Sequence, residues 1–296
     1  MSLNKPILKL RDWINKDKLN FSFLSKNINA IEMLKENKDK IDWYELSANP
    51  NAIEILEDNL DKLRWFQLSR NENPIAIRML KDNPDKIQWS LLSLNPGAIK
   101  ILEENWDKIN WNYLSANENA IKILKANEDK INWCYLSRNS NAIELLEANK
   151  DKIMWCLLAI NPNAIKLLEA NEDKINWHNL SLNSSAIQLL ERRQDKIDWK
   201  ALSRNPNAIQ LLKRRPDKIN WNCLSANENA IKLLEANQDK INWDYLSGNP
   251  AIFELDYKAM KKNNETMYEE LIKEVMKPSR VFKNPDYDYI EELFGD

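Results

Sequence analysis

The sequence contains very little glycine and histidine. Its 296 residues include three glycines and a single histidine, His178. Phosphate-binding loops and dinucleotide-binding turns require clustered glycines, and a histidine-rich metal site requires several histidines. We therefore expect no cofactor and no metal, and we do not expect an enzyme.

Cysteines and long apolar runs are also scarce. The three cysteines, Cys134, Cys156 and Cys223, are too few for a disulfide framework, which predicts a reducing, intracellular setting. No apolar run is long enough to span a bilayer, and the first residues lack the apolar region of a signal peptide. Because the net charge is only −2, we expect no general attraction to nucleic acid or to a membrane surface.

Tryptophan and asparagine, in contrast, are abundant, with 12 and 41 residues. The tryptophans belong to a repeat of 22 residues, D-K-I-x-W-x-x-L-S-x-N-x-x-A-I-x-L-L-x-x-N-x, whose positions we number from 1 at the aspartate. A fixed period of this length predicts a stack of similar structural units. One copy is 24 residues long, and the last of the eleven copies is truncated. The copies begin at Asp17, Asp39, Asp61, Asp85, Asp107, Asp129, Asp151, Asp173, Asp195, Asp217 and Asp239.

The copy at residues 39–60 indicates two short helices per repeat. Trp43 and Leu46 are three residues apart, which places them on one helical face, and Asp42 before them is a good N-cap. A second apolar stripe follows at Ala52, Ile53 and Leu56. We expect Asn59 to end this second helix in the left-handed conformation, where asparagine would replace the missing glycines.

We therefore predict an all-α solenoid of about ten 22-residue two-helix repeats, because helices this short need neighbours to be stable. With about 10 Å per repeat, the array would be an open rod or arc of about 100 Å. The alternative is a leucine-rich-repeat-like α/β coil, since Ile41 and Trp43 alternate about Asp42 as in a short strand.

The ends of the array differ from the repeats. We assign residues 1–16 to an N-terminal cap helix, residues 17–252 to the solenoid, and residues 253–296 to a helical cap with an acidic, aromatic tail. The tail, residues 284–294, either caps the array or docks onto a partner. Buried candidates in the C-terminal helices are Leu255, Met260, Met267, Leu271, Ile272 and Val275.

The repeat resembles a largely uncharacterised tandem-repeat family of giant viruses, the nucleocytoplasmic large DNA viruses. Residues 246–257 resemble the exit from the repeats in that family, and residues 273–281 resemble its closing segment, where Lys277 replaces a common histidine. The resemblance implies a viral protein located in the host cytoplasm or the virion. It implies a repeat scaffold and no reaction.

Departures from the consensus indicate candidate binding residues. Arg193 and Arg215 replace the asparagine at position 21 in two consecutive repeats, and each follows another arginine. Arginine binds carboxylates and phosphates through two hydrogen bonds. The arginine cluster (Arg192, Arg193, Arg214, Arg215) therefore either binds an acidic partner or pairs locally with carboxylates. Trp106, at position 22, is expected to be exposed and either anchors an interface or packs locally.

Two further patterns favour structural interpretations. A tryptophan three residues before a recurrent leucine is more simply core than a ladder for stacking bases. Cys134, Cys156 and His178 share position 6 in successive repeats and suggest a metal ladder. However, stacked helices are about 8–10 Å apart, which is too far for three ligands to share one metal ion.

We predict a non-enzymatic repeat scaffold or adaptor for protein–protein interaction, acting as a host-directed factor or a virion or assembly component. Its partner is a protein, and an acidic one would fit the arginine cluster. One alternative is a single-stranded nucleic-acid-binding repeat protein, which would require a basic, aromatic stripe. The other is a purely structural spacer.

Overall fold

The structure is a computed structural model that describes residues 6–275. These residues divide into two compact units. The first unit comprises residues 12–252 and contains the repeats. The second comprises residues 6–11 together with residues 253–275. The acidic tail predicted at residues 284–294 lies outside the described part of the chain.

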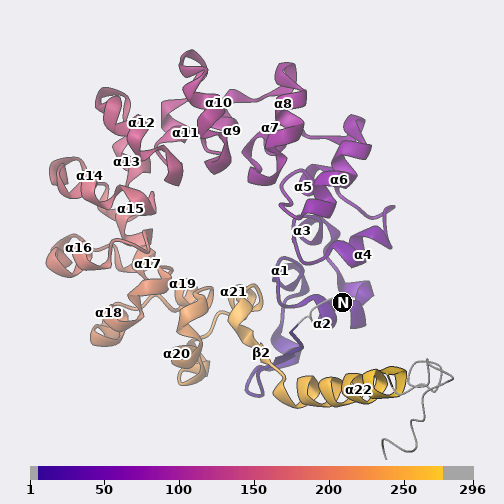
Figure 1. The fold of residues 1–296 in the computed structure, drawn as a ribbon. Coiled ribbons are helices and arrows are strands. Elements are labelled where there is room, and N and C mark those ends of the chain that lie inside the picture. Colours follow the sequence, from indigo (N-terminus) through magenta and orange to yellow (C-terminus); the bar gives the residue numbers. More distant parts are fainter. Residues whose placement is uncertain (1–5, 276–296) are drawn as a thin grey trace, which may run out of the picture. The chain divides into compact units, whose positions relative to one another are not determined.

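Each repeat begins with a short inner helix that starts at position 5 (Figure 1). In most repeats the side chain of the residue before the helix caps its first turn, as the sequence predicted, whereas Arg64, Gln88 and Met154 make no such bond. The carboxylate of Asp42, for example, accepts the backbone amides of Tyr44 and Glu45. Within residues 12–252 the inner helices are α1 (Phe21–Ser25), α3 (Trp43–Ser47), α5 (Trp65–Leu68), α7 (Trp89–Leu94), α9 (Trp111–Ser115), α11 (Trp133–Leu136), α13 (Trp155–Leu158), α15 (Trp177–Leu182), α17 (Trp199–Leu202), α19 (Trp221–Ser225) and α21 (Trp243–Ser247).

The first ten repeats continue into a second, outer helix. It starts near position 15, and its apolar side chains pack inward: Leu56 at position 18 is fully buried, and so is Ala52 at position 14. Figure 1 shows these helices outside the inner ones. They are α2 (Ile31–Glu36), α4 (Ile53–Glu57), α6 (Pro74–Asp82), α8 (Ile99–Glu104), α10 (Ile121–Lys125), α12 (Ile143–Ala148), α14 (Ile165–Glu169), α16 (Ile187–Arg192), α18 (Ile209–Arg214) and α20 (Ile231–Glu235).

The unit is thus a helical repeat array. Residues 12–252 contain no strand. At the point where the leucine-rich-repeat-like alternative required one, Asp42 caps a helix and Trp43 is its first residue. The α/β alternative is therefore wrong for this unit.

Buried serine and asparagine side chains join each repeat to the preceding one. The hydroxyl of Ser25, at position 9, donates to the carbonyl oxygen of Phe21 and accepts the backbone amide of Asp42 in the next repeat. Asn49, at position 11, donates from Nδ2 to the carbonyl oxygens of Ser25 and Asn27, at 3.0 and 3.2 Å. Since buried polar groups need partners, these bonds fix the stacking of the repeats.

The first and eleventh repeats are joined by the same bonds. The backbone amide of Asn20 donates to Ser247 Oγ at 2.9 Å, and Asn27 Nδ2 donates to the carbonyl oxygens of Ser247 and Asn249 at 3.0 Å. Helix α1 packs against α21 as it does against α3. The repeat array is therefore closed into a ring (Figure 1).

The array is a closed ring and not the open rod or arc that we expected. The curvature of a repeat array follows from a small rotation between successive repeats, and here eleven repeats complete one turn, so each rotates by about 33°. The consensus fixes the contacts between repeats but does not reveal this angle. The terminal repeats consequently contact each other.

The tryptophans at position 5 lie between repeats and are only partly buried. The fully buried side chains are instead those at positions 8, 14 and 18, for example Leu46, Ala52 and Leu56. A cation from the next repeat covers several of the tryptophan rings: Lys62 Nζ lies 4.9 Å from the centre of the Trp43 ring. Lys18 lies 5.1 Å from Trp243 in the same way across the closure. The lysine of the Asp-Lys pair thus makes a cation–π contact with the preceding repeat.

The asparagine at position 21 ends the outer helix differently from our expectation. None of the described residues has a positive φ. Asn105, for example, has φ −139° and ψ 58°, and its Nδ2 donates to the carbonyl oxygen of Ile101 at 2.8 Å. The equivalent Asn59 donates to Ile55. Asparagine is used here because its side chain bonds an otherwise free carbonyl of the last turn.

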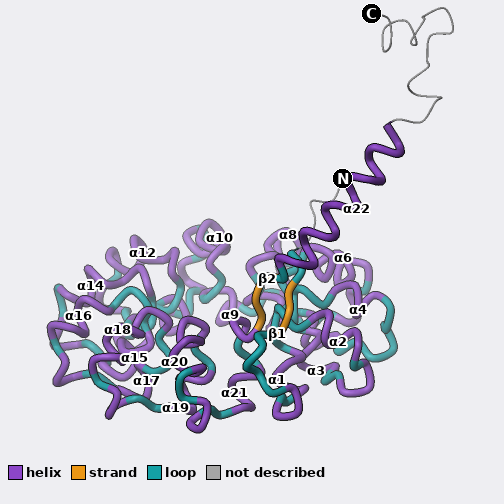
Figure 2. The backbone as a smooth tube through the Cα atoms, turned by 90° about the horizontal axis from the view of Figure 1, so that it is seen from below, coloured by secondary structure: helices purple, strands orange, loops and turns teal. Residues whose placement is uncertain are grey.

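The second unit contains a two-stranded antiparallel sheet and one long helix. Strand β1 (Leu8–Leu10) pairs with β2 (Phe253–Leu255), with Lys9 opposite Glu254 (Figure 2). Helix α22 (Tyr257–Val275) follows. Residues 8–10 therefore form a strand where we predicted a cap helix. Leu255 and Ile272, predicted to be buried, are 37% and 59% exposed.

No helix among the described residues is both long enough and apolar enough to cross a bilayer.

Candidate functional site

All four residues of the arginine cluster pair with carboxylates of their own unit. Arg192 bonds Glu169, and Arg214 bonds Glu191 at 3.0 Å, so the two pairs repeat one geometry in consecutive repeats. Arg193 bonds Glu172. Arg215 bonds Asp217 at 3.2 Å and thereby lowers the pKa of that carboxyl.

Two of these arginines also replace the lysine that usually covers a tryptophan. The guanidinium carbons of Arg193 and Arg215 each lie 5.4 Å from the ring centre of the tryptophan in their own repeat, Trp177 and Trp199 respectively. Their ion pairs cross to neighbouring repeats, Arg193 to Glu172 in the preceding one and Arg215 to Asp217 in the next, so both residues help to join repeats. A partner would have to compete with carboxylates that are already bound.

Trp106 is exposed and also packs locally. Its side chain is 46% exposed, and its ring centre lies 6.0 Å from that of Trp111 in the next repeat. The expected exposure and local packing are both present, and a role as an interface anchor stays a prediction.

Several residues at position 6 bond to the capping residue of the next repeat. His178 Nδ1 lies 2.7 Å from Asp198 Oδ2. Burial raises the pKa of Asp198, but the hydrogen bonds with His178 and with the amide of Ala201 outweigh burial and lower it. The preceding two residues at this position, Cys134 and Cys156, are free, partly buried thiols.

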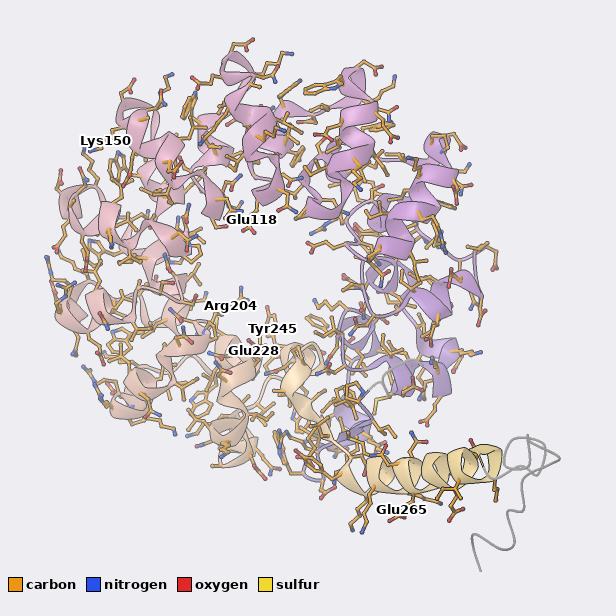
Figure 3. All side chains as sticks on the ribbon, viewed as in Figure 1. Glu118, Lys150, Arg204, Glu228, Tyr245 and Glu265 are labelled. Carbon is orange, nitrogen blue, oxygen red and sulfur yellow. The ribbon has the colours of Figure 1, made fainter. Side chains whose placement is uncertain are left out.

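A different surface presents variable side chains at three positions of the repeat. Position 7 is on the inner helix, position 10 lies at or just after its end, and position 12 follows. In Figure 3, Tyr245 at position 7, Arg204 at position 10 and Glu228 at position 12 point to the inside of the ring, whereas Lys150 points outward. We call the side chains at positions 7, 10 and 12 the inner surface.

On the inner surface, cations and carboxylates occupy different positions of the repeat. Position 10 contains four cations and no acidic residue: Lys26, Arg70, Arg138 and Arg204. All four are exposed, and none forms an ion pair with another described residue. Position 12 contains three acidic residues and no cation: Glu72, Glu118 and Glu228. The four cations lie in repeats 1, 3, 6 and 9, so they are distributed around the ring.

Aromatic side chains at position 7 lie beside some of these cations. Tyr135 is in α11, and Arg138 follows the end of that helix and donates its backbone amide to the carbonyl oxygen of Tyr135; the Tyr135 ring centre lies 5.6 Å from that of Tyr113. Phe23 and Tyr245 meet where the ring closes, with ring centres 5.8 Å apart. The inner surface therefore combines cations, carboxylates and aromatic rings on a repeated backbone.

Sequence analysis did not identify this surface. The binding residues predicted from the sequence, the arginine cluster and Trp106, lie at positions 20, 21 and 22. The available signal was the variation at positions 7, 10 and 12, which flank the invariant buried residues Leu and Asn at positions 8 and 11. Only the closure of the array shows that these variable positions face one enclosed space.

Comparisons of the chain with protein-family models, with curated proteins and with solved structures find no match.

Proposed function

We propose that the protein is a non-enzymatic scaffold that binds a protein partner on the inner surface of the ring. This proposal is carried by one observation, the contrast between the nearly invariant buried positions of the repeat and the varied positions of the inner surface. Positions 8, 9 and 11 are almost the same in every repeat and are buried, whereas positions 7, 10 and 12 differ between repeats. Positions 10 and 12 are accessible, and so is position 7 except at Gln67, Ala201 and Cys223. A uniform backbone that presents varied side chains is typical of repeat proteins that bind other proteins.

Two further features support a binding role. Free cations and carboxylates on one surface select partners by charge complementarity. Tyrosine is a frequent anchor at protein interfaces because it offers a large, rigid, apolar area and a polar tip. The viral origin remains part of the proposal and rests on the resemblance of the repeat sequence alone.

A specific observation also favours the nucleic-acid alternative. Arg138 and Tyr135 place a cation and an aromatic ring within three residues of each other on the inner surface, as a base-stacking groove requires. Glu118 and Glu228 on the same inner surface argue against it, because they repel phosphates. Filter binding of oligo-dT at increasing salt tests this alternative, since phosphate contacts produce a steep loss of affinity.

Affinity capture with mass spectrometry tests the proposed function. The tagged full chain is compared with an inner variant (Arg70→Gln, Arg138→Gln, Arg204→Gln) and a matched outer variant (Arg192→Gln, Arg214→Gln). We expect a protein captured by the wild type and the outer variant to be lost from the inner variant. Loss from the outer variant alone would move the interface to the arginine cluster. Capture abolished by nuclease would support nucleic acid, and no specific protein with any of the three would support a spacer.

A further inference from the structure

The closure of the ring creates a pocket on the inner surface. It has a volume of about 350 Å³ and is lined by Phe23, Lys26, Arg204, Ala226, Tyr245 and Gly248. These residues come from the first repeat and from the last three, so the pocket exists only because the array is closed. We call it the closure pocket.

The pocket combines two cations with two aromatic rings. Lys26 Nζ lies 4.1 Å from the centre of the Phe23 ring, and the Arg204 guanidinium carbon lies 5.8 Å from that of Tyr245. The two rings meet edge to face. The cations are thus held at the rings by cation–π contacts, while neither forms an ion pair with a described carboxylate.

Small residues at position 10 leave room for the closure pocket. Gly248 and Ala226 occupy position 10 in the last two repeats; seven of the other nine repeats have leucine, isoleucine, lysine or arginine there, and two have alanine. A Cβ at Gly248 would lie 3.4 Å from Lys26 Cε and 3.6 Å from the Phe23 ring. A larger side chain at this position would therefore fill the pocket without meeting rigid backbone at close range.

We infer that the closure pocket binds a carboxylate side chain, Asp or Glu, from an acidic segment of the partner protein. This inference rests on the proposed function and specifies the partner's chemistry. Lysine and arginine donate charge-assisted hydrogen bonds to a carboxylate, and the aromatic rings pack on its aliphatic stem. Glu228, two residues after Ala226, points to the inside of the ring but does not line the pocket.

Fluorescence anisotropy with a labelled (Gly-Glu)4 peptide tests the inference on the full chain. Its (Gly-Gln)4 counterpart is the matched neutral probe, and oligo-dT is the nucleic-acid probe. We expect the Glu peptide to bind more tightly than the other two. Lys26→Gln and Arg204→Gln should each weaken it about tenfold, since each removes one charge-assisted bond. Arg70→Gln, at the same repeat position outside the pocket, should leave the affinity within about twofold.

A second pair of variants separates the pocket from general charge attraction. Gly248→Leu fills the pocket without changing any charge and should abolish binding. Ala48→Leu makes the equivalent change at position 10 of the second repeat and should not. Thermal unfolding checks that both fold. Equal affinity for the Glu and Gln peptides, no binding of the Glu peptide, or an unaffected Gly248→Leu variant would overturn the inference. If the Gly248→Leu variant still captured a cellular partner, the proposed scaffold function would be retained and the role of the closure pocket would be rejected.

Discussion

At the scale of single residues, the most buried polar side chains hold the molecule together. Serine at position 9 and asparagine at position 11 have almost no exposed surface, yet both use their donors and acceptors fully. Ser137, for example, donates to Trp133 and accepts the amide of Met154. A buried group that lost its partner would destabilise the fold by about 1–3 kcal/mol, which explains why these positions hardly vary.

The seventh repeat is an exception that allows a test. Ala159 occupies position 9, and its methyl group cannot accept the amide of the next repeat. Ala159→Ser should therefore increase the free energy of unfolding by about 1 kcal/mol, through one regained hydrogen bond. Ser137→Ala in the preceding repeat is the matched control and should decrease it by a similar or larger amount. Urea unfolding measures both, and a destabilised Ala159→Ser variant would contradict the prediction.

At the scale of helices, the 24-residue repeat shows how an insertion is accommodated. Its outer helix α6 has nine residues, Pro74–Asp82, and Asn73 caps it by accepting the amide of Ile75. Position 12 of this repeat, Glu72, lies close to Gly97 at position 13 of the following repeat and leaves little space there. A Cβ at Gly97 would lie 3.3 Å from Asn95 Oδ1 and 3.4 Å from the carbonyl oxygen of Glu72.

This crowding reverses the usual effect of restoring a consensus residue. Position 13 is asparagine in most repeats, so the consensus alone predicts that Gly97→Asn stabilises the fold. The structure predicts the opposite, a loss of about 1–2 kcal/mol, because the new side chain meets backbone. Ser185→Asn restores the same residue after a repeat of normal length and should be neutral or mildly stabilising. Differential scanning calorimetry measures the pair, and a stabilised Gly97→Asn variant would count against the crowding.

Local features could be predicted from the sequence, and long-range ones could not. Short local patterns in the sequence were enough to predict where each repeat begins, that it contains two helices, and that Asp42 caps the first of them. The arginine cluster was recognised as a departure from the consensus, and local pairing was one of its two interpretations. The inner surface was missed because it depends on the rotation between repeats, to which many small contacts contribute.

At the scale of the whole repeat unit, closure gives every repeat two neighbours. An open solenoid has two terminal repeats with one exposed stacking face each, and such ends fray. Here the closing junction uses the hydrogen bonds of every other junction, together with the Lys18–Trp243 contact. The closing junction should therefore be as stable as the others.

Two equivalent asparagines test whether the closing junction is as stable as an ordinary junction. Asn27 spans the closure, and Asn139 spans an ordinary junction; each is 1% exposed and donates to two carbonyl oxygens. Asn27→Ala and Asn139→Ala should each decrease the free energy of unfolding by about 2–3 kcal/mol. Urea unfolding followed by tryptophan fluorescence compares them. An Asn27→Ala variant with little effect would show that the array is open in solution.

The closed array also restricts how the gene can change. Open repeat proteins gain and lose repeats by duplication or deletion, because an additional unit only lengthens the stack. In a ring, a twelfth or a missing unit would alter the rotation at every junction from about 33° to about 30° or 36° at once. The number of repeats is therefore a property on which the whole unit depends, and substitutions within repeats are the simpler route to new binding properties.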